Sequence, residues 1–200
     1  MWLARKKREH KLPPIILQGE RLFLRPPAIS DWQQWSKVRS RNQEFLTPFE
    51  PSWPENCLNQ DFFEKRLKKQ TNDWYAGRSH SFLIFENKNA ALIGGININN
   101  VNRGAAQQAT LGYWLDHKEQ GNGFMTEALS LIIDFGFDEL DLHRFNAGCL
   151  LDNEKSRNLL LRVGFEEEGL ARKYVKINGK WRDHRLFGLP VESWRSSASK

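Results

Sequence analysis

The stretch from Gly112 to Ala128 holds the residues whose types and spacing best fit the binding of a charged ligand. A β-type run ends at Leu115, a polar stretch follows, and Gly121-Asn122-Gly123 leads directly into a helical pattern. Glycines let the backbone approach a ligand closely, and the unpaired N–H groups of a helix's first turn attract anions. The stretch therefore predicts a phosphate-binding turn. A tight strand-to-helix turn without a ligand is the alternative.

Other common ligand motifs are missing from the sequence. Neither G-x-x-x-x-G-K-[ST] nor G-x-G-x-x-G occurs, because Gly123 is followed by Phe124, Met125 and Thr126. Nucleoside triphosphates and NAD are therefore poor candidates. The two cysteines and five histidines are scattered without the spacing of metal ligands, so we expect no metal site.

Four short motifs follow one another in a fixed order along the chain. They are Leu111 to Leu115, Gln120 to Met125 with its continuation to Leu129, Asn153 to Ser156, and Gly164-Phe165. In this order they resemble the GNAT superfamily of N-acetyltransferases, and within it the RimJ and RimL group of ribosomal-protein-alanine N-acetyltransferases. The likeness covers about residues 17–190. Met125 departs from the general Gly/Ala pattern of the loop, as it does in RimJ-like members.

This resemblance implies a fold and a cosubstrate. The fold is α/β (α+β), the GNAT fold, with a central mixed, mostly antiparallel sheet, helices on both faces and two splayed parallel strands that hold acetyl-CoA. A bulged strand at Tyr113 to Leu115 would bind the pantetheine arm, and loop amides from Gln120 to Thr126 would bind the pyrophosphate. The implied cofactor-binding residues are Tyr113, Trp114, Leu115, Gln120, Gly121, Asn122, Gly123, Phe124, Met125, Thr126, Asn153 and Ser156.

The resemblance also nominates a catalytic residue. Many family members carry a tyrosine four residues before the glycine of Gly164-Phe165, whereas this chain has Leu160, which cannot donate a proton. Ser156 lies where RimL-like enzymes place a donor for the departing thiolate, so we expect Ser156 to donate a proton or a hydrogen bond to the sulfur. Helix capping is the alternative role for Asn153 and Ser156. The sequence identifies no general base.

The acceptor follows from the subgroup, and the segment Trp181 to His184 looks like the final hairpin of RimJ-type enzymes. An α-amino group has a pKa of about 7.7–8.0 and a lysine one of about 10.4, so deprotonating the former costs roughly 3.5 kcal/mol less. The first hypothesis is acetyl transfer to the N-terminal amine of a ribosomal protein that begins with alanine, by direct attack in a ternary complex. Acetylation of a small amine or aminoglycoside is one alternative, which an acidic acceptor groove would favour. A non-enzymatic acetyl-CoA-binding module associated with the ribosome or RNA is another.

The net charge of +6 is concentrated near the N-terminus, where five basic residues stand against Glu9 within the first eleven. This leader could make weak contact with the ribosome or rRNA through phosphates, or it could be a solvated tail. The apolar stretch from Leu12 to Leu17 is short and broken by two prolines, so it does not fit an export signal. We expect a cytoplasmic protein without a membrane segment.

The elements that position these residues fit one domain. We expect a basic, flexible N-terminal extension (1–16), a single N-acetyltransferase domain (17–193) and a flexible C-terminal tail (194–200). Helices are expected from a capping pattern at Ser30 and Gln33, over 58–75, over 125–138 and up to Gly164. Strands are expected at 21–25, 81–86, 91–98, 109–115, 144–149, 165–177 and 181–186, the last two joined by an Asn178-Gly179 turn.

Overall fold

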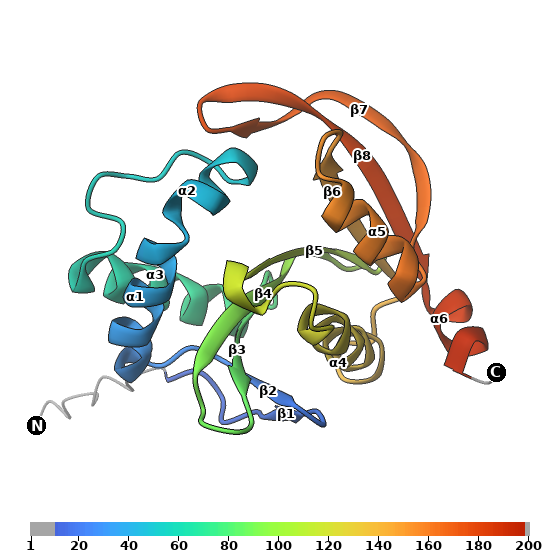
Figure 1. The fold of residues 1–200 in the computed structure, drawn as a ribbon. Coiled ribbons are helices and arrows are strands. Elements are labelled where there is room, and N and C mark those ends of the chain that lie inside the picture. Colours follow the sequence, from blue (N-terminus) through green and yellow to red (C-terminus); the bar gives the residue numbers. More distant parts are fainter. Residues whose placement is uncertain (1–10, 199–200) are drawn as a thin grey trace, which may run out of the picture.

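The computed structural model describes residues 11–198 of the chain, with side chains up to residue 196. Within this part, eight strands form one sheet (Figure 1). The strands are β1 (Leu17–Gln18), β2 (Leu22–Arg25), β3 (His80–Glu86), β4 (Leu92–Asn102), β5 (Gln108–Leu115), β6 (Arg144–Leu150), β7 (Glu166–Ile177) and β8 (Lys180–Pro190). The helices are α1 (Trp32–Arg41), α2 (Gln43–Leu46), α3 (Gln60–Tyr75), α4 (Phe124–Asp138), α5 (Glu154–Val163) and α6 (Val191–Ala198).

The sheet order is β1-β2-β3-β4-β5-β6-β8-β7, and every neighbouring pair is antiparallel except β5 and β6. The parallel pairing joins only Gln108–Thr110 to Arg144–Asn146. Beyond those residues β5 continues to pair with β4 and β6 with β8, so the two parallel strands separate. The predicted mixed, mostly antiparallel sheet with two splayed parallel strands is confirmed.

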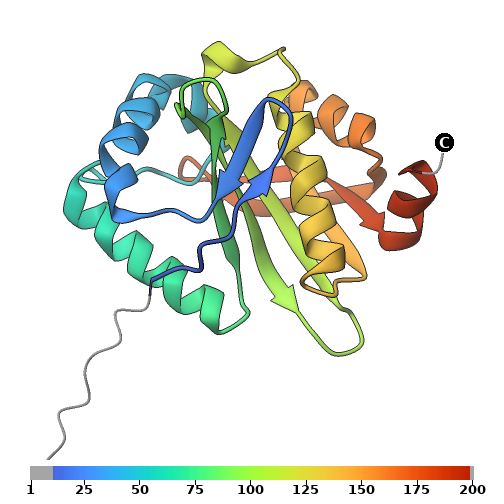
Figure 2. The same ribbon diagram turned by 90° about the horizontal axis from the view of Figure 1, so that it is seen from below.

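Side chains of the sheet alternate between two hydrophobic clusters, one on each face. In β3, Phe82 and Ile84 pack with α4 and α5, whereas Leu83 and Phe85 pack with α1 and the first half of α3. Figure 2 shows the helices lying on either side of the strands. Helices therefore cover both faces, as predicted.

Helix α4 has the clearest packing pattern of the helices. Its apolar residues recur at i, i+3, i+4, i+7 and i+8 from Met125 to Ile133, and all of these are at most 7% exposed. Gly136 lies so close to β6 that a Cβ there would be 2.1 Å from Cζ of Phe145. This contact sets α4 tightly against the sheet, with its N-terminus at the end of the loop that leaves β5.

The start of α1 differs from the prediction. Ser30 is not the helix cap: it lies in a 3-10 turn, Ile29–Asp31, and α1 begins at Trp32. The buried carboxylate of Asp31 accepts a hydrogen bond from the backbone N–H of Ala28 at 2.7 Å and forms an ion pair with Arg25. The hydrogen bonds of Asp31 to Ala28 and Arg25 therefore accompany a 3-10 turn in place of a cap at Ser30.

The two ends of the described chain are packed. Residues 1–10 of the predicted extension lie outside the described residues, while Leu12 and Ile15 pack against the core. At the other end, residues 194–198, which were predicted to begin a flexible tail, continue helix α6. The indole Nε1 of Trp194 donates a hydrogen bond to Asp134 of α4 at 2.7 Å, which ties α6 to the domain.

Candidate active site

The loop between β5 and α4 begins where β5 has separated from β6, since their parallel pairing ends at Thr110 and Asn146. It contains a 3-10 turn, His117–Glu119, followed by Gln120 and the two glycines. Gly121 has φ 81° and Gly123, the N-cap of α4, has φ 79°. Residues with side chains rarely adopt this left-handed region, so both glycines are needed for the turn.

Six consecutive backbone N–H groups in this loop, those of residues 121–126, have no hydrogen-bond acceptor within the described part of the chain. The next one, of Glu127, donates to the carbonyl of Gly123 at 3.2 Å. The side chains of Phe124 and Met125 are buried in the core, so only their amides can serve a ligand. A row of free amides at the positive end of a helix dipole is suited to an anion.

Arg21 holds this loop from the side, a role that the sequence analysis did not find. Its Nη1 donates to the carbonyl of Asn122 at 2.7 Å, and its Nε donates to Glu127 at 2.9 Å. Its backbone N–H donates to the other carboxylate oxygen of Glu127, also at 2.9 Å. Both oxygens of Glu127 are thus engaged in anchoring the loop and the first turn of α4.

The second part of the site is a pair of hydroxyl groups. The Tyr113 hydroxyl of β5 lies 2.7 Å from Oγ of Ser156 in the first turn of α5. Asn153 is the N-cap of α5, and its side-chain oxygen accepts from the backbone N–H of Ser156 at 3.1 Å. Asn153 is therefore a helix cap, as the alternative role supposed, whereas the Ser156 hydroxyl is free of capping. Leu160 is fully buried in the core.

The environment keeps the Tyr113 phenol protonated. Burial raises the pKa of Tyr113 well above its usual range, and the nearby thiol of Cys149 raises it further, while the hydrogen bond with Ser156 acts in the opposite direction. The pair therefore offers hydroxyl groups, not a phenolate, at neutral pH.

The predicted bulge at Tyr113 to Leu115 is absent. These residues pair in uninterrupted register with Ile96, Gly95 and Gly94 of β4, and the register shift of this strand pair lies at Asn99–Asn102. A Cβ on Gly94 would be 2.6 Å from the Trp114 carbonyl, and one on Gly95 would be 2.6 Å from the Trp114 indole nitrogen. The two glycines let the strands approach closely without a bulge.

The side chains of Trp114 and Leu115 do not point into the space between β5 and β6. The Trp114 indole packs in the cluster on the α1 and α3 side of the sheet, and Leu115 packs in the other cluster. A ligand between β5 and β6 could therefore contact only the backbone of these two residues.

Gln120 and Lys155 connect the loop to α5. The Nζ of Lys155 donates to the side-chain oxygen of Gln120 at 2.9 Å, and it also lies 6.0 Å from the centroid of the Phe45 ring. The start of α5 is thus linked to the loop through Lys155 and Gln120, and to β5 through the hydroxyls of Ser156 and Tyr113.

Asp116, an acid near the loop, also has a structural environment. Burial alone would raise the pKa of Asp116, but hydrogen bonds from Arg41 and Asn42 outweigh this effect and lower it. Its side chain is 1% exposed and fully engaged by these two residues, which join α1 to the end of β5. It is not arranged as a base.

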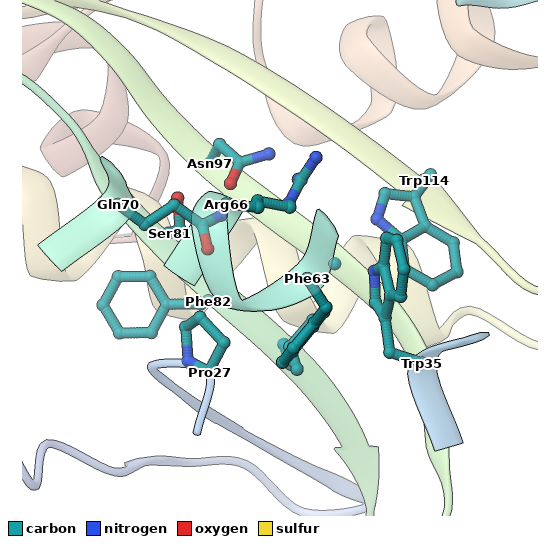
Figure 3. A pocket seen from close by; sticks show the side chains of 11 residues that line it. Pro27, Trp35, Phe63, Arg66, Gln70, Ser81, Phe82, Asn97 and Trp114 are labelled. Carbon is teal, nitrogen blue, oxygen red and sulfur yellow. The ribbon is translucent and has the colours of Figure 1, made fainter. Parts of the chain in front are cut away.

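A small hollow opens on the other face of β5, between α1, α3 and the sheet (Figure 3). Its wall includes Trp35, Phe63 and Trp114, and its polar side chains are Arg66, Gln70, Ser81 and Asn97. Tyr113 and Trp114 are neighbours in one strand, so they point to opposite faces. The hollow therefore lies behind the strand that carries the hydroxyl pair.

Arg39 packs against Trp114, one of the walls of this hollow. Its guanidinium forms two hydrogen bonds with the carboxylate of Glu50, at 2.8 and 2.5 Å, and lies between the rings of Trp53 and Trp114 at 4.2 and 5.0 Å. The backbone N–H of Asn178, in the β7–β8 turn, donates to the backbone carbonyl of Glu50 at 2.9 Å. The hairpin thus reaches across to the segment that follows α2, as Figure 1 shows.

Residues 11–198 contain neither a cluster of metal-ligand residues nor a helix that could span a membrane. No group of three or more His, Cys, Asp or Glu side chains in this range could hold a metal ion. None of its helices combines the length and the apolar character that crossing a bilayer requires.

The splayed strands and the loop of free amides define an acetyltransferase of the GNAT class. Residues 21–166 match the family described as Acetyltransferase (GNAT) domain, and the chain belongs to this family of N-acetyltransferases.

Its relatives lie in the RimJ and RimL group of ribosomal-protein acetyltransferases, as predicted. The chain is 33% identical over 183 residues to the [Ribosomal protein uS5]-alanine N-acetyltransferase of Escherichia coli, covering 92% of this chain and 94% of that one. It is 34% identical over 174 residues to the Probable N-acetyltransferase YjcK of Bacillus subtilis, covering 87% and 96%. The structure of Mycobacterium smegmatis RimJ in complex with CoA-disulfide is similar, with a TM-score of 0.82, 31% identity and coverage of 89% and 88%.

Proposed function

We propose that this protein transfers an acetyl group from acetyl-CoA to the N-terminal amine of a ribosomal protein, with alanine as the first residue. The observation that carries the proposal is the row of free amides at residues 121–126, in the loop that follows the strand of Tyr113 and its hydroxyl partner Ser156. The name of the E. coli relative supports the acceptor, and the M. smegmatis RimJ complex with CoA-disulfide supports the cosubstrate. A cytoplasmic location and weak rRNA contact through the leader are part of the same proposal.

Each part of acetyl-CoA would meet groups of this protein that can bind it. The amides of residues 121–126 would hold the pyrophosphate, because they are donors without partners at a helix N-terminus. The facing edges of β5 and β6 beyond Thr110 and Asn146 have no ladder partner, so their backbone groups would bind the amides of the pantetheine arm. Asn153 keeps its side-chain NH₂ for a ligand while its oxygen caps α5.

When bound, acetyl-CoA supplies a thioester whose acyl carbon accepts an amine. As the carbon–nitrogen bond forms and the carbon–sulfur bond breaks, the nitrogen loses one proton and the sulfur gains one. Ser156 would place a hydroxyl beside the departing sulfur, and Tyr113 would orient that hydroxyl and supply it with a hydrogen bond. The protein otherwise acts by positioning the two reactants.

The charge of the side chains that line the hollow helps to decide between the alternative acceptors. Among the described residues that line the hollow, Arg66 is the charged one, so the hollow is not the acidic groove that an aminoglycoside or a polyamine would need. An α-amino group carries at most one positive charge, and it loses that charge at a pH closer to neutrality than a lysine does. The arrangement therefore favours an N-terminal acceptor over a small polycation.

The test is acetyl-CoA consumption by the purified protein with peptides that begin with Ala, Ser or Met, a peptide whose only free amine is a lysine, and small amines. We expect turnover with the N-terminal peptides, highest for alanine. Turnover with small amines alone would overturn the acceptor, and measurable acetyl-CoA binding without any turnover would favour the non-enzymatic alternative. Removing residues 1–10 tests the leader separately, because a tether would change ribosome association and not peptide turnover.

A further inference from the structure

Arg66 is a cation without a counterion at the hollow behind β5. It lines the hollow from α3 together with Gln70, and its guanidinium lies 5.8 Å from the centroid of the Trp35 ring. No described residue accepts a hydrogen bond from it or forms an ion pair with it. Five N–H donors are therefore available to a ligand.

The surroundings leave the charge of Arg66 unmatched. Glu50 is the acid whose charge acts on Arg66, but Arg39 already engages both of its carboxylate oxygens. Arg66 as a whole is an exposed residue of α3, although its side chain lines the hollow. An arginine is protonated at neutral pH, so the hollow has a positive charge that no described acid pairs with directly.

The other polar groups of the hollow are also unused. The side chains of Gln70, Ser81 and Asn97 form no hydrogen bond within the described part of the chain. Ser81 and Asn97 are cross-strand partners in β3 and β4, and Gly112 of β5 is the next in the same row. In the view of Figure 3, the Arg66 guanidinium lies between Asn97 and Trp114. Hydroxyl and amide donors thus accompany the guanidinium.

We propose that this hollow binds a carboxylate carried by the acceptor, and that Arg66 makes acidic acceptors preferred. A carboxylate has only acceptor atoms and matches the fork of a guanidinium, which is the donor set left open here. The inference rests on the proposed function for the placement of the acceptor on this face of β5. The carboxylate has two possible sources, an acidic side chain near the amine of a peptide or the α-carboxylate of a free amino acid.

The test compares Ala-initiated peptides with Glu at position 2, 3 or 4 against the same peptides with Gln, and against free alanine. For the unmodified protein we expect kcat/KM to be roughly tenfold higher for at least one Glu peptide than for its Gln counterpart, which corresponds to the strength of a charge-assisted hydrogen bond. Arg66→Gln should abolish this preference while leaving the Gln peptides within roughly twofold. If, of all these acceptors, only the turnover of free alanine depends on Arg66, the carboxylate is the α-carboxylate of a free amino acid.

The matched control is Lys65→Gln, which removes one positive charge from the neighbouring position of α3 without altering the lining of the hollow. It should keep the preference, and Arg66→Lys should keep part of it. Equal rates for Glu and Gln peptides in the unmodified protein, or an equal loss for both in Arg66→Gln, would overturn the inference.

Peptide binding measured by calorimetry separates this inference from the proposed function. If no acceptor is turned over but a Glu peptide binds more tightly than its Gln counterpart and only when Arg66 is present, the carboxylate site stands and the acetyl transfer does not. If peptides are turned over with no effect of charge, the transfer stands and the carboxylate site does not.

Discussion

The hydroxyls of Tyr113 and Ser156 lie 2.7 Å apart and join strand β5 to the first turn of helix α5. We expect Ser156→Ala to lower kcat roughly tenfold to hundredfold, because the departing sulfur would lose a hydrogen bond of the charge-assisted kind. Asn153 binds the backbone of Ser156, so the helix cap survives the substitution. Steady-state kinetics should show a smaller change in KM for acetyl-CoA than in kcat.

Tyr113→Phe should lower kcat to a similar degree, and the double variant should be no slower than the slower single variant, because the two hydroxyls act as one unit. Ser36→Ala is the matched control, since Ser36 also loses one hydrogen bond, to the carbonyl of Leu58, but lies in α1. Multiplicative losses in the double variant would contradict a shared role.

The loop of free amides gives a second prediction. Gly121 and Gly104 both have positive φ, 81° and 65°, and a Cβ at either would have no heavy atom within 4 Å. Replacing either by alanine should cost about 1 kcal/mol of folding stability from backbone strain. Only Gly121→Ala should also raise KM for acetyl-CoA, by roughly tenfold, since only this loop would hold the pyrophosphate. Equal KM values for the two variants would contradict the anion-binding role.

Glu127 supplies a third prediction, since its position near the loop makes a base role conceivable. Both of its oxygens bind Arg21, and its side chain is 16% exposed. We expect Glu127→Gln to lower stability by about 1 kcal/mol through the weakened pair and to leave the shape of the pH–rate profile unchanged. A loss of the acidic limb of that profile, where the rate rises as a base loses its proton, would identify Glu127 as a base.

The elements of this fold that could be predicted are those whose signal is local. The apolar repeat of α4 and the Asn178-Gly179 turn between β7 and β8 depend on residues adjacent in the chain, and both lie where the sequence placed them. The capping pattern at Ser30 is also local, but it competes with the pairing of Asp31 with Arg25 and Ala28, and the structure has the latter.

The parts of the site that were missed depend on contacts between distant segments. Arg21 meets Glu127 across 106 positions, and no periodicity or motif marks either residue as a partner of the other. The hollow gathers Arg66 from α3, Asn97 from β4 and Trp114 from β5, so it exists only after the sheet has formed. The loop motif predicted amides from Gln120 to Thr126, of which those of 121–126 are free and that of Gln120 donates to the His117 carbonyl, whereas the arginine that holds the loop required the structure.

His80 provides the last prediction, for stability against pH. Its side chain is 5% exposed, both ring nitrogens lack a hydrogen-bond partner in the described part of the chain, and it packs against the rings of Trp74 and Phe135. Burial lowers the pKa of His80 to about 4, with a further contribution from Arg103. An unfolded histidine titrates near 6.5, so between about pH 6.5 and pH 4 the unfolded chain binds a proton that the folded protein does not.

This difference makes folding less favourable as the pH falls from 7.5 to 5, by up to about 2 kcal/mol from this residue. We expect His80→Phe and His80→Gln to remove that part of the loss, whatever their effect on stability at pH 7.5, because neither side chain titrates. Urea unfolding at pH 7.5 and pH 5 measures the change for each protein. If the unmodified protein and both variants lose the same free energy between the two pH values, His80 is protonated in the folded state more easily than its apolar surroundings imply.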